Sequence, residues 1–273
     1  MKKIGLPITI VLFVHTLSAQ STKAFKSLQD ALAKPEQVRV LELRNQGLKT
    51  VPADIAKLVN LEKLDLSNNE ISELPATIAE LKKLKSLWVG NNQLTTLGNI
   101  EQITTLVNVK ADNNPFQKPN EELKKISLLP NIVLLSFSAN KVSVLPNSLY
   151  SLTKLIELDL SYNAIRIMPE GIEKLSGLKK LNLARNFFSV FPKSFFGLRN
   201  LENIDISYND FKVLQPEFSL LPMLQVLDCS FNKLLSVVPN LPHLQFLNMR
   251  STKLILKSMQ QKKQISEMCS VIM

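Results

Sequence analysis

A single pattern recurs along most of this chain and leaves few ways of folding it. The stretch from Leu155 to Gly177 reads LIELDLSYNAIRIMPEGIEKLSG, with apolar residues in fixed slots and Asn163 three residues after Leu160. The same spacing returns about every 23 residues. A fixed period of this length indicates a solenoid, in which each unit stacks on the next and the core grows with the number of units. We therefore expect one elongated domain.

Each unit contains a segment that predicts a short strand. Between Leu158 and Ser161 (LDLS), apolar and polar residues alternate with the period of a half-buried strand. Stacked in parallel, such strands form one sheet, and the other leucines fill the space between this sheet and the outer segments. Because strands pack closer together than the outer segments, the stack bends with the sheet inside. The expected fold is an α/β solenoid: an arc with one short parallel strand per unit on the concave face and mostly irregular or short helical convex segments.

One asparagine per unit stands where the chain leaves the strand. A buried amide can donate twice and accept twice, so it can satisfy backbone groups of its own turn and of the neighbouring turn that no sheet ladder reaches. An amide used in this way is not available to a ligand. We assign this structural role to Asn69, Asn92, Asn114, Asn140, Asn163, Asn186, Asn209 and Asn232.

The units LEKLDLSNNEISELPATIAELKK and LIELDLSYNAIRIMPEGIEKLSG resemble leucine-rich repeats of the type that carries Leu-Pro-x-x-Ile-x-x-Leu in its outer half. Such repeats occur in Ras-suppressor-like and LAP-type scaffolds and in many bacterial exported proteins. The resemblance covers residues 38–256, about ten repeats with the last incomplete. In that family the concave sheet commonly binds another protein, which is what the resemblance implies here. The sequence lacks the cysteine-rich caps of extracellular animal members, and no catalytic domain is recognised after the array.

The segments outside the regular repeats have their own signatures. Residues 1–19 show the basic, apolar, small-residue order of a cleavable signal peptide, with a cut expected after Ala19. Their apolar run is shorter than the roughly 20 residues that span a bilayer, so no transmembrane span is expected in the mature chain. Residues 20–37 predict a capping helix with Ser21 or Ser27 as N-cap. A further helix is expected from Asn120 to Ile126, and residues 257–273 form either a C-terminal cap or a tail.

The chain is basic, with a formal net charge of +10, and only Lys2 and Lys3 of its cations lie in residues 1–19. For an exported protein, this charge favours an anionic polysaccharide or the cell envelope over nucleic acid, although scattered lysines are also ordinary soluble surface. Cys229 occupies a core slot and Cys269 lies near the end of the chain. We expect free thiols. The predicted location is secreted, periplasmic or cell-surface.

Specificity is expected at the exposed strand positions and in the slot before each asparagine, because these do not serve the core. Trp88 is either an interface anchor or packed against strand neighbours such as Lys110 and Asp65. The acidic positions are expected to be unpaired charges facing water. The candidate binding residues are Trp88, Lys110, Leu134, Asp159, Tyr162, Arg185, Asp205, Tyr208, Asp228 and Phe231.

Catalysis finds little support in the sequence. Asp205 and Asp228 on adjacent strands have a spacing that suits a metal ion or paired catalytic carboxylates, but no histidine stands beside them. After residue 19 only His243 remains, without a nucleophile, metal-ligand or phosphate-loop motif around it. We expect no enzyme activity, cofactor or metal. The expected function is an exported protein-binding module; the alternatives are a carbohydrate- or envelope-binding structural protein, and an intracellular signalling scaffold if the N-terminus is not a signal.

Overall fold

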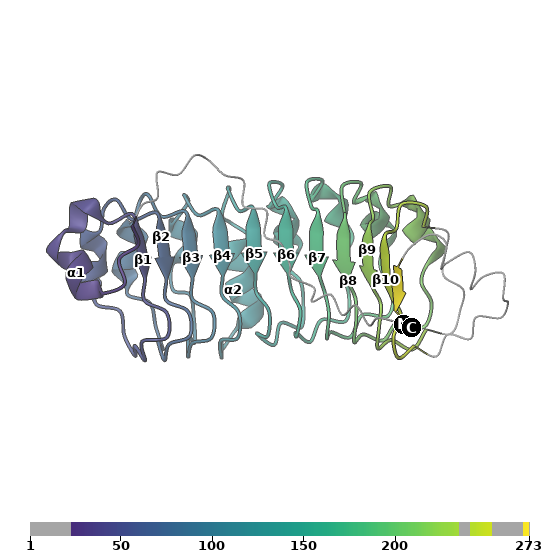
Figure 1. Cartoon of the computed structure of the whole chain (residues 1–273), viewed down its shortest axis with the longest axis horizontal. Coiled ribbons are helices and arrows are strands. Elements are labelled where there is room, and N and C mark those ends of the chain that lie inside the picture. Colours follow the sequence, from purple (N-terminus) through teal and green to yellow (C-terminus); the bar gives the residue numbers. More distant parts are fainter. Residues whose placement is uncertain (1–22, 235–240, 253–269, 273) are drawn as a thin grey trace, which may run out of the picture.

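The fold is one parallel sheet whose strand order follows the sequence (Figure 1). The computed structural model describes residues 23–234, 241–252 and 270–272, so the predicted signal peptide and Cys269 lie outside the described part. The strands are β1 (Val40–Glu42), β2 (Lys63–Asp65), β3 (Ser86–Trp88), β4 (Asn108–Lys110), β5 (Leu134–Ser136), β6 (Glu157–Asp159), β7 (Lys180–Asn182), β8 (Asn203–Asp205), β9 (Val226–Asp228), β10 (Phe246–Asn248) and β11 (Ser270–Ile272). The repeats predict the first ten, and β11, which pairs in parallel with β10, adds a strand that they do not predict.

The repeat period sets the strand register. Leu41 of β1 lies beside Leu64 of β2, and Leu64 beside Leu87 of β3. The middle residue of every strand from β1 to β10 is buried in this way. Because side chains alternate along a strand, the first and third residues point to the opposite side of the sheet. We call that side the open face.

The outer segments are mostly short 3-10 helices, as predicted. They are η1 (Pro35–Gln37), η2 (Ala53–Lys57), η3 (Ala76–Glu80), η4 (Ile100–Gln102), η5 (Asn147–Ser151), η6 (Ile172–Lys174), η7 (Lys193–Gly197) and η8 (Pro216–Leu220). Pro52, Pro75, Pro146 and Pro192 precede η2, η3, η5 and η7. Proline suits these positions because its fixed φ starts the turn and its missing N–H leaves no donor unsatisfied.

The helix expected before the first repeat is α1 (Leu28–Ala33). The Ser27 hydroxyl accepts a hydrogen bond from the Asp30 N–H at 3.2 Å, as an N-cap does. Phe25 extends the sheet: its N–H donates to the Val40 carbonyl at 2.9 Å, and its own carbonyl accepts from the Glu42 N–H at 2.8 Å. This segment therefore covers the outer edge of β1.

The helix expected in the fourth repeat is α2 (Pro119–Ile126), but its start differs from the prediction. Lys118 occupies the N-cap position and Pro119 begins the helix, since proline is favoured in the first turn. Asn120, where the helix was expected to begin, lies in its first turn, and its side-chain oxygen accepts a hydrogen bond from the Ser143 N–H of the next repeat at 3.1 Å.

The asparagine ladder is present as predicted, with all eight amides between 1% and 7% exposed. The Asn163 carbonyl oxygen accepts from the N–H groups of Asn140 and Val142 at 3.1 and 2.9 Å. Its NH₂ group donates to the carbonyls of Phe137 and Leu160 at 3.0 and 2.9 Å. Each amide thus joins the turn of one repeat to that of the preceding repeat.

Cys229 lies in the core and is a free thiol, as predicted. Its Sγ donates to the Asn248 carbonyl at 3.3 Å. Burial, followed by the negative charge of Asp228, raises the pKa of this thiol well above its ordinary range. The neutral thiol is inert, so Cys229 behaves as a small hydrophobic residue.

Candidate binding surface

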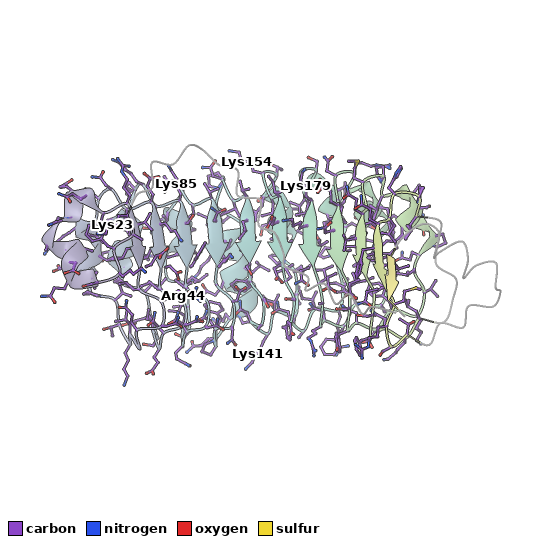
Figure 2. All side chains as sticks on the ribbon, viewed as in Figure 1. Lys23, Arg44, Lys85, Lys141, Lys154 and Lys179 are labelled. Atoms are coloured by element: carbon purple, nitrogen blue, oxygen red, sulfur yellow. The ribbon has the colours of Figure 1, made fainter. Side chains whose placement is uncertain are left out.

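Basic side chains lie along both edges of the sheet, at the starts and at the ends of the strands. Lys85 and Lys179 lie along the upper edge in Figure 2, where the strands begin, and Arg44 lies towards the lower edge, where they end. The upper-edge lysines are paired across neighbouring repeats, Lys85 with Glu62 at 2.7 Å and Lys179 with Glu202 at 2.8 Å. We call the edge at which the strands end the C-terminal edge.

The aspartates of the open face are hydrogen-bonded, so the prediction that they are unpaired charges facing water is wrong. Asp159, Asp205 and Asp228 are half-buried, and each accepts a hydrogen bond from the N–H of the serine two residues later, at 2.8, 2.8 and 2.9 Å. Asn182 and Asn248 in the same slot accept equivalent bonds at 3.1 Å. A carboxylate or amide oxygen is needed here because the strand ends and leaves this N–H without a sheet partner.

Crowding of these carboxylates affects their titration. The pKa of Asp205 is raised, first by burial and then by the Asp228 and Asp159 charges, although hydrogen bonds from Ser207 oppose the shift. The pKa of Asp112 is likewise raised by burial and by Asp159, against hydrogen bonds from Ser136 and Ser138. Asp205 and Asp228 are in register on adjacent strands, as predicted. Within the described ranges, however, no three His, Cys, Asp or Glu side chains are grouped so that they could hold a metal ion.

Trp88 is covered by lysines and does not project as an open apolar anchor. Its ring lies between Lys63 and Lys110, whose Nζ atoms are 4.1 and 4.9 Å from the ring centroid. The sequence left open that Trp88 packs against strand neighbours such as Lys110 and Asp65. The contact with Lys110 is present, and the second contact is made by Lys63 and not by Asp65. Leu134, the apolar candidate in β5, is half-buried between Asn108 and Glu157 of the adjacent strands.

Four predicted residues, Tyr162, Arg185, Tyr208 and Phe231, come together as one stack at the C-terminal edge. The Arg185 Cζ atom lies 4.9 Å from the Tyr162 ring centroid and 3.9 Å from that of Tyr208. The Tyr208 and Phe231 rings are 4.2 Å apart and within 9° of parallel. All four side chains are exposed, Tyr162 by 57%. We call these four residues the edge stack.

The structure also shows an exposed aliphatic row that we did not predict. Val144, Ile167, Val190 and Val213 occupy the same slot of four consecutive repeats and are 46–74% exposed. The signal was present in the sequence, since the corresponding slots of the preceding repeats hold Thr50, Glu73, Thr96 and Lys118. The row becomes visible only when the residues in this slot of the first four repeats are compared with those of the next four.

Comparison with known families supports the repeat assignment along the chain. Residues 11–134 match a family described as leucine-rich repeat region. Residues 166–211 and 176–234 match a leucine rich repeat family, and residues 154–175 match another of the same description. The chain is a leucine-rich repeat protein. Among curated proteins, no sequence match is found.

Solved structures show the same fold. A leucine-rich repeat protein of Leptospira interrogans is 22% identical with a TM-score of 0.53, over 92% of this chain and 100% of that one. The plant peptide hormone receptor RGFR1 in complex with RGF2 is 23% identical with a TM-score of 0.66, over 82% of this chain and 37% of that one. TLR13 in a complex with ssRNA13 is 25% identical with a TM-score of 0.65, over 80% of this chain and 34% of that one. The likeness establishes a leucine-rich repeat arc, in which the open face is concave.

The chain therefore spans the full length of the bacterial protein but about a third of each receptor chain. Leucine-rich repeat families typically serve as non-enzymatic binding scaffolds. None of the helices in the described residues is long and apolar enough to cross a membrane.

Proposed function

We propose that this protein is an exported, non-enzymatic binding module that holds a protein partner against its open face and the adjoining C-terminal edge. One observation carries the proposal. The buried slots repeat almost unchanged, whereas the outward first position of successive strands changes from Lys63 to Ser86, Asn108, Leu134 and Glu157. A repeating core beneath a non-repeating surface is what a recognition scaffold requires.

The solved neighbours add support, since the plant receptor is in complex with its peptide ligand RGF2. Binding is tested by affinity capture from the envelope and medium of the source cells, comparing wild type with Trp88→Ala and Leu134→Lys. Loss of a specific protein with either open-face variant supports the proposal. Lys174→Ala, in the outer helix η6, is the matched control and should capture the same protein as wild type. Equal capture by all four proteins would argue against the open face.

Export is proposed from the basic, apolar, small-residue order of residues 1–19. N-terminal sequencing of the protein from its source cells is expected to begin at Gln20. An intact Met1 on protein in the cytosol would replace this proposal with the intracellular scaffold.

The carbohydrate- or envelope-binding alternative rests on the net charge of +10. It predicts binding to an anionic polymer that weakens with salt and is insensitive to the open-face variants. Several lysines weaken this alternative, because Lys63, Lys85, Lys179 and Lys180 already pair with glutamates of neighbouring repeats.

A further inference from the structure

The edge stack occupies a backbone position that does not favour its side chains. The residue before each ladder asparagine has a positive φ, between 49° and 55°. In the second, third and fourth repeats this residue is Asn68, Asn91 and Asn113, and asparagine tolerates the left-handed region well. In the four consecutive repeats of the edge stack it is Tyr, Arg, Tyr and Phe, for which the region is unfavourable. The turn imposes this conformation in every repeat, on Ala139 as well, so the four residues of the edge stack are held there at a cost in backbone strain.

The stacking determines which atoms remain available. The Arg185 guanidinium lies over the rings of Tyr162 and Tyr208, which belong to the repeats on either side, and the Phe231 ring stacks on that of Tyr208. The five N–H donors of a guanidinium lie in its plane, so they point out between the covering rings. No carboxylate of the described residues pairs with Arg185, in contrast to the lysines of the opposite edge. The arginine is thus held against two rings and has no carboxylate partner among the described residues.

A second stacked arginine lies close to the edge stack. The Arg166 Cζ atom is 4.7 Å from the ring centroid of Phe187, which follows Arg185 by two residues. Arg166 also lacks a carboxylate partner among the described side chains and is exposed. Beyond it runs the aliphatic row of Val144, Ile167, Val190 and Val213. Two planar cations in adjacent repeats, Arg166 and Arg185, are thus accompanied by exposed aliphatic side chains in four repeats.

We propose that the edge stack, together with Arg166 and Phe187, binds an extended segment of a partner protein that carries carboxylate side chains between apolar residues. Carboxylates accept paired hydrogen bonds from the in-plane donors of Arg185 and Arg166. The apolar residues of the segment cover the rims of the aromatic rings and the aliphatic row. This inference rests on the proposed protein-binding function and specifies the chemistry of the partner.

Nucleic acid and polysaccharide fit the edge stack less well. Single-stranded nucleic acid binds by stacking its bases on open aromatic faces. Here the faces of Tyr208 and Arg185 are already occupied by their neighbours in the stack. Sugar rings need the same open faces. The rims and the in-plane donors that remain suit carboxylates and aliphatic side chains.

The test is selection of peptides from a random display library on the full-length protein. Enriched peptides are expected to share Asp or Glu next to Leu, Ile, Val or Phe. Replacing that acid by Asn or Gln should weaken binding about tenfold or more, and Arg185→Gln should do the same to the original peptide. Arg44→Gln, a matched exposed arginine at the same edge of the first repeat, should leave binding unchanged.

Tyr208→Asn and Phe231→Asn extend the test without requiring a change in fold. Asparagine relieves the left-handed strain that tyrosine and phenylalanine incur, which offsets the lost stacking, so the urea midpoint should stay near that of wild type. Peptide binding should be lost.

Each of four outcomes would overturn the inference. Enriched peptides without an acid, or binding that survives Arg185→Gln, contradict it directly. Peptides lost only with Leu134→Lys would place recognition on the open face and leave the proposed function standing. A labelled single-stranded RNA that binds wild type and is released by Arg185→Gln would make the edge a nucleic-acid site. If no peptide is enriched and affinity capture also yields no specific protein, the proposed function fails as well.

Discussion

At the scale of single residues, different slots of the repeat serve two purposes. Some side chains hydrogen-bond backbone groups that the sheet leaves unpaired, and others are available for recognition. The slot that closes the turn accepts either Asp159 or Asn182, because both present an oxygen to the N–H two residues later. The ladder slot requires an amide, since it must donate and accept at once. Recognition is left to slots whose side chains have no such obligation.

The ladder can be tested at Asn163, whose amide makes bonds to five backbone groups in two repeats. Asn163→Ala leaves these buried groups unpaired and should lower the free energy of unfolding by about 1–3 kcal/mol. Urea denaturation followed by circular dichroism measures the change. Asn200→Ala removes an exposed amide that donates to the Ser176 carbonyl, and should change stability by less than about 0.5 kcal/mol. Equal effects of the two substitutions would refute the structural role of the ladder.

A second residue-scale prediction concerns Asp205. Its pKa is raised in the folded protein, so its contribution to stability is present below the ordinary value of 3.8 and is lost as the pH rises through the folded-state value. Asp205→Asn keeps the turn acceptor, as Asn182 shows in the same slot. The variant should be more stable than wild type at pH 7, and the difference should vanish near pH 3.

Urea midpoints of wild type and Asp205→Asn at several pH values between 3 and 8 give this difference. Glu73→Gln alters an exposed carboxylate and serves as the control. A difference for Asp205→Asn that is independent of pH would contradict the prediction, because it would not come from ionisation.

The residue patterns that the period controls could be predicted from the sequence. The core slots and the asparagine ladder follow directly from a repeat that buries the same positions each time. The position of Trp88 between Lys63 and Lys110 could not be predicted, since it depends on which rotamers three neighbouring strands adopt together. The same holds for the edge stack: its members were predicted as candidates, but not that they contact each other.

At the scale of elements, α2 of the fourth repeat stabilises the part of the third repeat that departs from the usual Leu-Pro pattern. The third repeat has Leu97-Gly98 where other repeats have Leu-Pro. Glu122 of α2, only 4% exposed, accepts hydrogen bonds there from the Leu97 N–H and the Thr96 hydroxyl, both at 2.9 Å. Lys125 pairs with the same carboxylate at 3.1 Å. The helix therefore supplies the acceptor for the Leu97 N–H, whereas the Gly98 N–H, which a proline would have removed, donates to the Thr96 hydroxyl at 3.1 Å.

Glu122→Ala leaves the Leu97 N–H buried without an acceptor and should destabilise the protein by about 1–3 kcal/mol. Glu121→Ala, one residue earlier in the same helix, removes an exposed pair with Lys124 at 3.7 Å and should have an effect near zero. Urea denaturation of both variants measures the contrast. Similar midpoints would mean that Glu122 is not the acceptor that the third repeat needs.

Prediction of the elements succeeded where local chemistry was explicit. The Leu-Pro pairs mark the starts of several 3-10 helices, and acids followed by bases mark α2. The exact start of α2 was missed because Pro119 competes with Asn120 for the first turn. Strand β11 was missed because the repeat pattern ends near Leu256, so the spacing of apolar residues does not predict a strand there.

At the scale of the whole molecule, a solenoid is held together by contacts between neighbouring repeats, so its ends are its weakest parts. Here α1 and the Phe25 segment cover the outer side of β1, where Leu41 and Leu43 would otherwise be exposed. Phe25 also packs against this core. Removing this cover should therefore destabilise the first repeats most, and the effect should decrease with distance along the array.

A variant beginning at Pro35 removes α1 and the Phe25 segment, and is compared with one beginning at Gln20. Its β1 and β2 amides should lose protection from hydrogen exchange, because their neighbour contacts are gone on one side and opening becomes local. Amides of β7 to β9, several repeats away, should keep theirs, which makes them an internal control within the same spectrum. Uniform loss of protection would show that the array unfolds as one cooperative unit. Unchanged protection in β1 would show that the N-terminal segment is not a cap, and that the buried Leu41 and Leu43 are held by the second repeat alone.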